Sequence, residues 1–120
     1  MAIRIKLGRY RTVHGDPLGR SCVGYFPGMS PEDVWQAGRG VWKLDRRRAE
    51  REGYALLVGG ELVRAVADIA ALVEHGDRVE LVGKLVGPGE SLHDAYVGSL
   101  DPVVRPSRNP VAYVALPEEP

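Results

Sequence analysis

The sequence predicts an α+β fold. We expect a small, mostly antiparallel sheet of about five strands, strongly bent or closed into a β-barrel, with one main helix. Three observations predict it. The chain of 120 residues is 44% hydrophobic, which suits one domain with a real core. Short β-rich runs are separated by glycine and proline. One strong helix start stands early in the chain. We expect the domain to cover residues 1–116 and residues 117–120 to form a frayed tail.

The first element is a strand. The segment AIRIKL alternates apolar residues with Arg4 and Lys6, as a half-buried strand does. The residues from there to Met29 are rich in glycine and proline, so they predict a loop. One short strand is expected within it, around Cys22–Phe26.

The main helix is expected to begin after Ser30. A serine is a good N-cap, and Pro31 suits the first helical position. Glu32 and Asp33 would then lie at the positive end of the helix dipole.

Both tryptophans follow this helix start. Their spacing of seven residues would place Trp35 and Trp42 on nearly one face of a continuing helix. Gly38 and Gly40 weaken such a helix by about 1 kcal/mol each relative to alanine. The helix therefore either ends near Gly38 or has a neighbour that approaches its backbone closely. Trp35 is the better candidate for core packing.

The second half of the chain reads mainly as strands. YALLVGGELVRAVADI predicts a hairpin that turns at Gly59-Gly60. DRVELVGKLV predicts another strand, in which Gly83 marks a bulge. A short helix capped by Ser91 and a last strand in PVAYVAL complete the expected elements.

The charge is balanced overall but uneven along the chain. Sixteen Lys and Arg residues balance sixteen Asp and Glu, yet residues 1–51 hold eleven basic and five acidic side chains. Such asymmetry can give one face a positive field. Cys22 is the single cysteine, and the chain shows neither a signal-peptide core nor an apolar run of membrane-spanning length. We therefore expect a cytoplasmic protein without membrane contact.

The usual catalytic and metal motifs are missing from the sequence. Gly83-Lys84 lacks the remaining residues of a P-loop. The three histidines lack metal-ligand spacing, so we expect neither a metal nor a cofactor. His93-Asp94 could act as an acid/base pair, although two polar residues on a solvated helix explain it as well. No catalytic residue is assigned.

A segment rich in tryptophan and arginine is the best candidate for a site. An indole stacks on a nucleobase, and neighbouring guanidinium groups hold phosphates. The candidate nucleic-acid-binding residues in this segment are Arg39, Trp42, Lys43, Arg46, Arg47 and Arg48. The alternative remains open that the tryptophans belong to the core and the basic residues to a solvated face.

Residues from about 28 to 114 resemble a family of short bacterial proteins of uncharacterised function. The resemblance rests on an ordered set of motifs: GMSPEDVWQAGRGVWKLDRRRAEREGYALLVGGELVRAVADI, RVELVGKLV, YVGS and RNPVAYV. The order of elements is in turn similar to the PUA-like superfamily, which includes the ASCH, EVE and YTH domains.

The PUA-like resemblance implies a small curved barrel with an RNA-binding or modified-base-binding cleft. Carried over by position, it adds Tyr54 and Asn109 to the candidate site and again marks Trp42, Arg47 and Arg48. The chain departs from the family pattern in two places. Ala67 stands where an aromatic residue is usual, and the segment before Asn109-Pro110 has no aromatic residue. These departures weaken the expected base-stacking platform.

Three functions remain open on the sequence. The leading hypothesis is a non-catalytic module that binds RNA, single-stranded DNA or a modified base. The second is a protein-interaction or regulatory module that forms a homodimer through edge strands such as PVAYVAL and binds an acidic partner. The third is a small nucleotide-processing hydrolase that uses His93 and Asp94.

Overall fold

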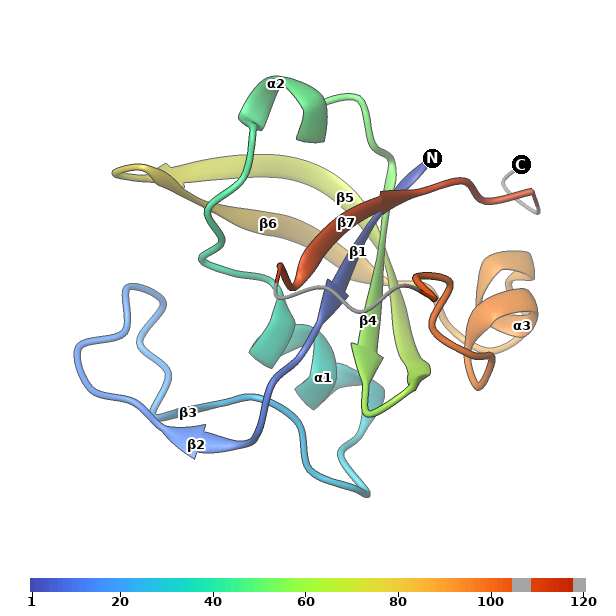
Figure 1. Cartoon of the computed structure of the whole chain (residues 1–120), viewed down its shortest axis with the longest axis horizontal. Helices are drawn as coiled ribbons and strands as arrows, with labels where there is room; N and C mark the ends of the chain where they lie inside the picture. The colour runs from blue at the N-terminus through green and yellow to red at the C-terminus, as the bar shows by residue number, and fades with distance from the viewer. Residues whose placement is uncertain (105–108, 118–120) are drawn as a thin grey trace.

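The structure, a computed structural model, describes residues 1–104 and 109–117 and arranges them around one five-stranded sheet (Figure 1). The fold is α+β, as predicted. The helices are α1 (Pro31–Gly38), α2 (Arg46–Ala49) and α3 (Ser91–Tyr96). The strands are β1 (Ala2–Lys6), β2 (Arg11–Thr12), β3 (Cys22–Val23), β4 (Tyr54–Gly59), β5 (Leu62–His75), β6 (Arg78–Leu85) and β7 (Val111–Val114).

The main sheet is open. Its strand order is β6-β5-β4-β1-β7, and every pairing is antiparallel except the parallel pair of β1 and β4. Strands β2 and β3 form a separate two-stranded ladder. A closed barrel would need β6 to pair with β7, but the backbone of Trp42 pairs with Val79 of β6 instead. The sheet is small and mostly antiparallel, as predicted, but it is not closed into a barrel.

Each face of the sheet carries its own apolar cluster. Along β4, Ala55 and Leu57 belong to the first cluster, whereas Leu56 and Val58 belong to the second. This alternation follows from the two-residue period of a strand. Helix α1 packs on the first cluster through Val34, and α3 contributes to the second. The two helices lie on opposite sides of β4 in Figure 1.

The predicted start of α1 is confirmed. The Ser30 hydroxyl accepts a hydrogen bond of 3.1 Å from the Asp33 amide, and Pro31 is the first helical residue. The helix ends at Gly38, because Arg39 is already its C-cap. A Cβ at Gly38 would lie 2.6 Å from Leu57 Cδ1, so the close approach proposed for this glycine is also present. Both explanations offered by the sequence hold together.

The predicted hairpin of β4 and β5 is present, but its turn lies one residue later than expected. Gly60 has a positive φ of 65°, whereas Gly59 is the last residue of β4. Gly59 is needed for another reason: a Cβ there would lie 2.4 Å from the Tyr25 ring.

Two other predictions for the second half of the chain, the bulge at Gly83 and the helix cap at Ser91, also need small corrections. The ladder of β5 and β6 is irregular opposite Gly83, but the extra residue lies in β5, between Ile69 and Ala71. Ser91 is the first residue of α3 and not its cap. The N-cap is Glu90, whose side chain makes no capping hydrogen bond to the helix.

Strand β1 is more deeply buried than its alternating pattern predicts. It lies between β4 and β7, and four of its five residues are buried. The side chain of Arg4 is only 5% exposed because Asp101 pairs with it, with Nε donating to the carboxylate at 2.9 Å. Arg4 also donates to the carbonyl of Pro110.

Two further expectations concern membrane contact and the C-terminal tail. Among the helices of the described residues, none has the length and apolar character to cross a membrane. The expected tail falls largely on residues 118–120, which lie outside the described part of the chain.

Candidate functional site

Trp42 lies just beyond α1, where the chain crosses to β6. Its backbone forms two hydrogen bonds with Val79, at 2.9 Å and 2.8 Å. Its indole Nε1 donates to the Gly38 carbonyl at 2.7 Å, and the ring packs against the first apolar cluster. The side chain is only half-buried, whereas Trp35 is 3% exposed and belongs to the core, as predicted. The indole is therefore held in one orientation while part of it faces solvent.

A hollow opens beside this indole, which we call the tryptophan hollow. Its volume is about 480 Å³, within the range of small-molecule sites. The residues that line it are Lys6, Leu7, Gly8, Arg9, Arg11, Val23, Gly24, Ala37, Trp42, Asn109 and Pro110. They come from the end of β1, the β2–β3 ladder, α1 and the chain just before β7.

The tryptophan hollow is positively charged. Lys6, Arg9 and Arg11 are exposed, and none forms an ion pair within the described part of the chain. None of the lining residues is acidic. The positive charge of Lys6 also helps to lower the pKa of the nearby Asp101 carboxyl, but hydrogen bonds from Arg4 and Val103 contribute more. An apolar wall with three exposed cations suits an anionic aromatic ligand.

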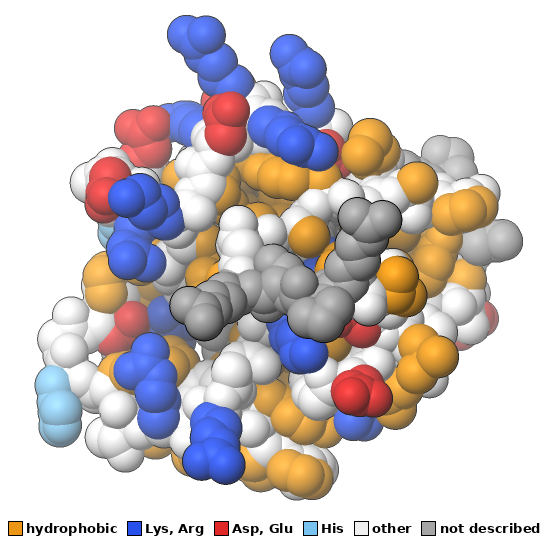
Figure 2. Space-filling model, viewed as in Figure 1, with side chains coloured by type: hydrophobic (Ala, Val, Ile, Leu, Met, Phe, Trp, Pro, Cys, Tyr) orange, Lys and Arg blue, Asp and Glu red, His pale blue; other side chains and the backbone are white. Residues whose placement is uncertain are grey.

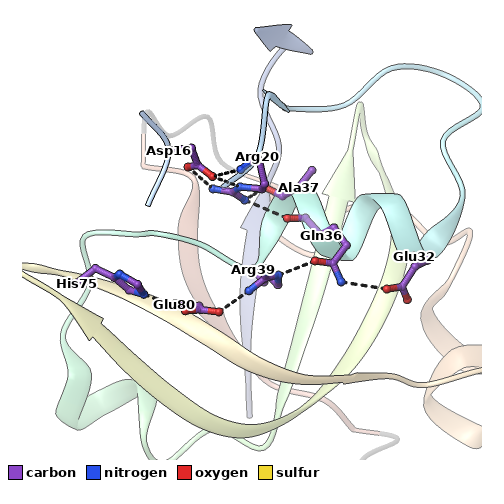
Figure 3. Close-up of polar contacts among 8 residues, drawn as sticks. All are labelled: Asp16, Arg20, Glu32, Gln36, Ala37, Arg39, His75 and Glu80. Carbon is purple, nitrogen blue, oxygen red and sulfur yellow. Dashed lines mark hydrogen bonds and ion pairs between the residues drawn. The ribbon is translucent and has the colours of Figure 1, made fainter. Parts of the chain in front are cut away.

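The hairpin that supplies Arg11 is tied to α1 (Figure 3). The Arg20 guanidinium donates to Asp16 and to the carbonyls of Gln36 and Ala37 at the end of the helix. These bonds satisfy carbonyls that a helix end leaves without partners. The hydrogen bonds from Arg20 lower the pKa of Asp16 to about 2. This contact fixes one side of the tryptophan hollow against the core.

Arg39, a predicted site residue, is turned away to another network (Figure 3). Its guanidinium pairs with Glu80 of β6 and donates to the Gln36 side chain at 2.7 Å. Glu80 also contacts His75 Nε2 at 2.9 Å. Arg39 thus joins α1 to β6, and it does not line the tryptophan hollow.

The arginine run predicted for the site forms α2, at a different place from the indole. Asp45 caps this single turn, and its carboxylate accepts hydrogen bonds from the amides of Arg47 and Arg48. Arg46 pairs with Glu50 at 3.0 Å and with Glu74 at 2.6 Å. The structure therefore does not bring the arginine run into the hollow beside Trp42.

A second hollow lies over α2, and we call it the arginine hollow. Its volume is about 570 Å³, and its lining residues are Met1, Asp45, Arg47, Arg48, Arg51 and Glu52. The Arg48 guanidinium carbon lies 3.9 Å above the centre of the Tyr113 ring, a cation–π contact. Burial raises the pKa of Tyr113, although the charge of Arg48 acts in the opposite direction.

The remaining predicted site residues are distributed over both faces of the sheet. Tyr54 is half-buried against the second apolar cluster, on the face opposite Trp42. Asn109 does line the tryptophan hollow, where its side-chain oxygen accepts a hydrogen bond of 3.0 Å from the Val111 amide. Lys43 is exposed and lines neither hollow.

Sequence reasoning missed the three cations of the tryptophan hollow. Lys6, Arg9 and Arg11 stand thirty or more residues before Trp42 and form no recognisable motif with it. The only sequence feature that points to these cations is the excess of basic residues in the first 51 positions. A charge count cannot show which cations share a surface, so only the fold identifies them.

The residues considered for catalysis do not join either hollow. His93 Nδ1 lies 3.2 Å from Asp94 Oδ1 on α3, and neither residue lines the tryptophan or the arginine hollow. The pKa of Asp94 is lowered chiefly by a hydrogen bond from the Gly89 amide and also by His93. Within residues 1–104 and 109–117, no group of three His, Cys, Asp or Glu side chains is arranged to hold a metal ion.

The comparisons with known proteins add no relative: the chain matches no protein family, no curated protein and no solved structure.

Proposed function

We propose that the protein is a non-catalytic module that binds single-stranded nucleic acid, with a base against Trp42 and phosphates on Lys6, Arg9 and Arg11. One observation carries this proposal: a half-buried indole lines the same hollow as three exposed cations that form no ion pair among the described residues. The proposed site still combines an aromatic ring with basic side chains, as the sequence predicts. Its cations, however, come from β1 and the β2–β3 region instead of the arginine run.

The physical basis is the pairing of a flat apolar surface with fixed positive charge. Stacking of a base on an aromatic side chain contributes about 1–3 kcal/mol and tolerates any base sequence. The hydrogen bond from Trp42 Nε1 to Gly38 already holds the ring, so less ordering is needed on binding. The three cations add phosphate contacts, whose strength depends on salt.

The resemblance to the PUA-like superfamily supports the same proposal. Many members of that superfamily bind RNA or modified bases in a cleft of a small β fold. The tryptophan hollow contains Trp42 and Asn109, two of the five positions that the resemblance marks. A modified base would bind in the same place, stacked on Trp42.

A second candidate is self-association through β7. This strand is the last in the order of the open sheet, so one of its edges has no partner in that sheet. Such an edge can pair with a second copy of the chain. Light scattering at increasing protein concentration tests this candidate, since a molar mass that stays at one chain argues against it.

Titration with a short ligand tests the main proposal. We expect 5′-phosphorylated tri-uridylate, which has three phosphates, to change the tryptophan emission, because Trp42 is half-exposed while Trp35 is buried. With three phosphate contacts the salt slope is about −0.7 × 3, or roughly −2.1. Raising salt from 50 to 200 mM then weakens binding about twenty-fold.

Charge variants show whether the tryptophan hollow is the site. Arg9→Gln combined with Arg11→Gln should reduce the slope to about −0.7, because one phosphate contact remains. A matched control is Arg78→Gln combined with Lys84→Gln, which removes two exposed cations of β6 that line neither hollow. The proposal fails if the wild-type emission does not respond at low salt, or if both double variants behave alike.

A further inference from the structure

We propose that a longer strand bound at the tryptophan hollow continues past the edge strand β7 into the arginine hollow, which forms a second phosphate site. This inference rests on the proposed function and extends it, since it specifies a strand of several nucleotides as the ligand. The observation behind it is that the two hollows lie at opposite ends of β1.

Strand β1 sets the separation of the two hollows. Lys6 at its end lines the tryptophan hollow, and Met1 just before its start lines the arginine hollow. Five residues of extended chain span about 16 Å at roughly 3.3 Å per residue. The neighbouring β7 covers the same stretch, with Val111 opposite Ile5 and Val114 opposite Ala2. An extended strand of a few nucleotides is long enough to reach both ends.

The arginine hollow presents guanidinium groups that form no ion pair within residues 1–104 and 109–117. Arg47, Arg48 and Arg51 are exposed, and none forms an ion pair with another described residue. The two carboxylates of the hollow offset part of this charge, but each has a contact of its own, and the Glu52 carboxylate lies 4.0 Å from the Met1 ammonium. Asp45 accepts backbone hydrogen bonds of α2, and the side chain of Glu52 is 5% exposed.

Arg48 adds a second stacking surface. Its guanidinium carbon lies 3.9 Å from the centre of the Tyr113 ring, a cation–π contact, and the side chain is still exposed. A guanidinium plane supported by an aromatic ring can stack on a base as well as bind a phosphate. The arginine hollow therefore repeats the combination found beside Trp42, with the guanidinium in place of the indole.

The surface between the two hollows carries further positive charge. Lys43 follows Trp42 in the chain that leads to α2, and it is exposed and forms no ion pair within the described residues. Figure 2 shows Lys and Arg side chains on one face, from α2 at the top down the left side to the β2 region. Acidic side chains lie among those at the left.

The test compares a short and a long ligand on the same variants. The 5′-phosphorylated tri-uridylate fits one hollow, whereas an oligouridylate of about ten nucleotides is within the usual range of single-strand sites. We expect Arg47→Gln combined with Arg51→Gln to leave the affinity for the short ligand unchanged. For the long ligand it should weaken binding about ten-fold at 50 mM salt and reduce the slope by about 1.4. The control is again Arg78→Gln with Lys84→Gln.

The outcomes separate this inference from the proposed function. If the double variant binds the long ligand like the wild type while the short ligand still binds, the second site is wrong and the proposed function stands. If the wild type binds neither ligand, both are overturned. An equal loss of affinity for both ligands also overturns the second site, because the variant then acts on the first hollow. Binding of poly-glutamate as tight as that of the long ligand would replace the nucleic acid by an acidic protein partner.

Discussion

Arg4 and Lys6 are two positions apart on β1, yet their environments differ completely. Strand alternation places both on one side, so the sequence predicts two solvated cations. In the structure Asp101 and the Pro110 carbonyl cover Arg4, whereas Lys6 at the strand end stays exposed beside Trp42. One cation therefore serves the fold and the other is available to a ligand.

The pair of Arg4 and Asp101 leads to a prediction at the residue scale. Asp101→Asn leaves the Arg4 guanidinium buried without its counter-charge, so we expect it to reduce the free energy of unfolding by about 3–5 kcal/mol. Urea denaturation measures this loss. The double variant Arg4→Met with Asp101→Leu removes both charges and should lose clearly less. A double variant as unstable as the single one would contradict a charge-pair explanation.

The sequence predicts the type of each helix and strand more accurately than the residues at which it begins and ends. The start of α1 depends on a local hydrogen bond from Asp33 to Ser30, which the sequence displays directly. The ends of other elements depend on contacts between segments. The turn after β4 lies one residue late, while Gly59 lies against the Tyr25 ring, and the bulge opposite Gly83 belongs to β5.

Gly83 offers a prediction at the scale of an element. A Cβ there would lie 1.9 Å from the Asp68 carbonyl oxygen, so the β5–β6 ladder would have to shift. We expect Gly83→Ala to lower the free energy of unfolding by about 3 kcal/mol. The control is Gly87→Ala, because the nearest atom to its Cβ would be Glu90 Oε2 at 3.6 Å and its φ is not positive. Equal stability of the two variants in urea titration would mean that the ladder adjusts without cost.

At the scale of the whole molecule, paired carboxylates link stability to pH. The pKa of Asp16 is lowered to about 2 by hydrogen bonds from Arg20. The pKa of Asp101 is also lowered, because the Arg4 and Val103 hydrogen bonds outweigh the raising effect of burial. The unfolded chain therefore binds protons at a higher pH than the native one, near pH 4.

The sign of this linkage gives a prediction. The stability contributed by Asp16 and Asp101 is fully present above about pH 4 and is lost as the pH falls through their native pKa values. We expect the thermal midpoint to decrease between about pH 4 and pH 2. The variant Asp16→Asn should be less stable at neutral pH and should show a shallower decrease. An unchanged pH profile in this variant would mean that Asp16 and Arg20 are not paired in solution.

The sequence by itself determined the local features: the α+β class, the capped start of α1, the β4–β5 hairpin and the core position of Trp35. Each depends on neighbouring residues, through a hydrogen bond, a turn preference or a periodic apolar pattern, so it can be read from a short stretch of chain. The sequence also singled out Trp42 and Asn109, although its arginine run belongs to another hollow.

Only the tertiary structure decided which cations accompany the indole. Lys6, Arg9 and Arg11 line the same hollow as Trp42, and Arg20 holds the hairpin that supplies Arg11 against α1. It also decided that Arg39 and Arg46 are engaged with Glu80 and Glu74 while Lys6 remains exposed. Charge composition counts side chains but not distances, and an ion pair between segments far apart in sequence leaves no local pattern.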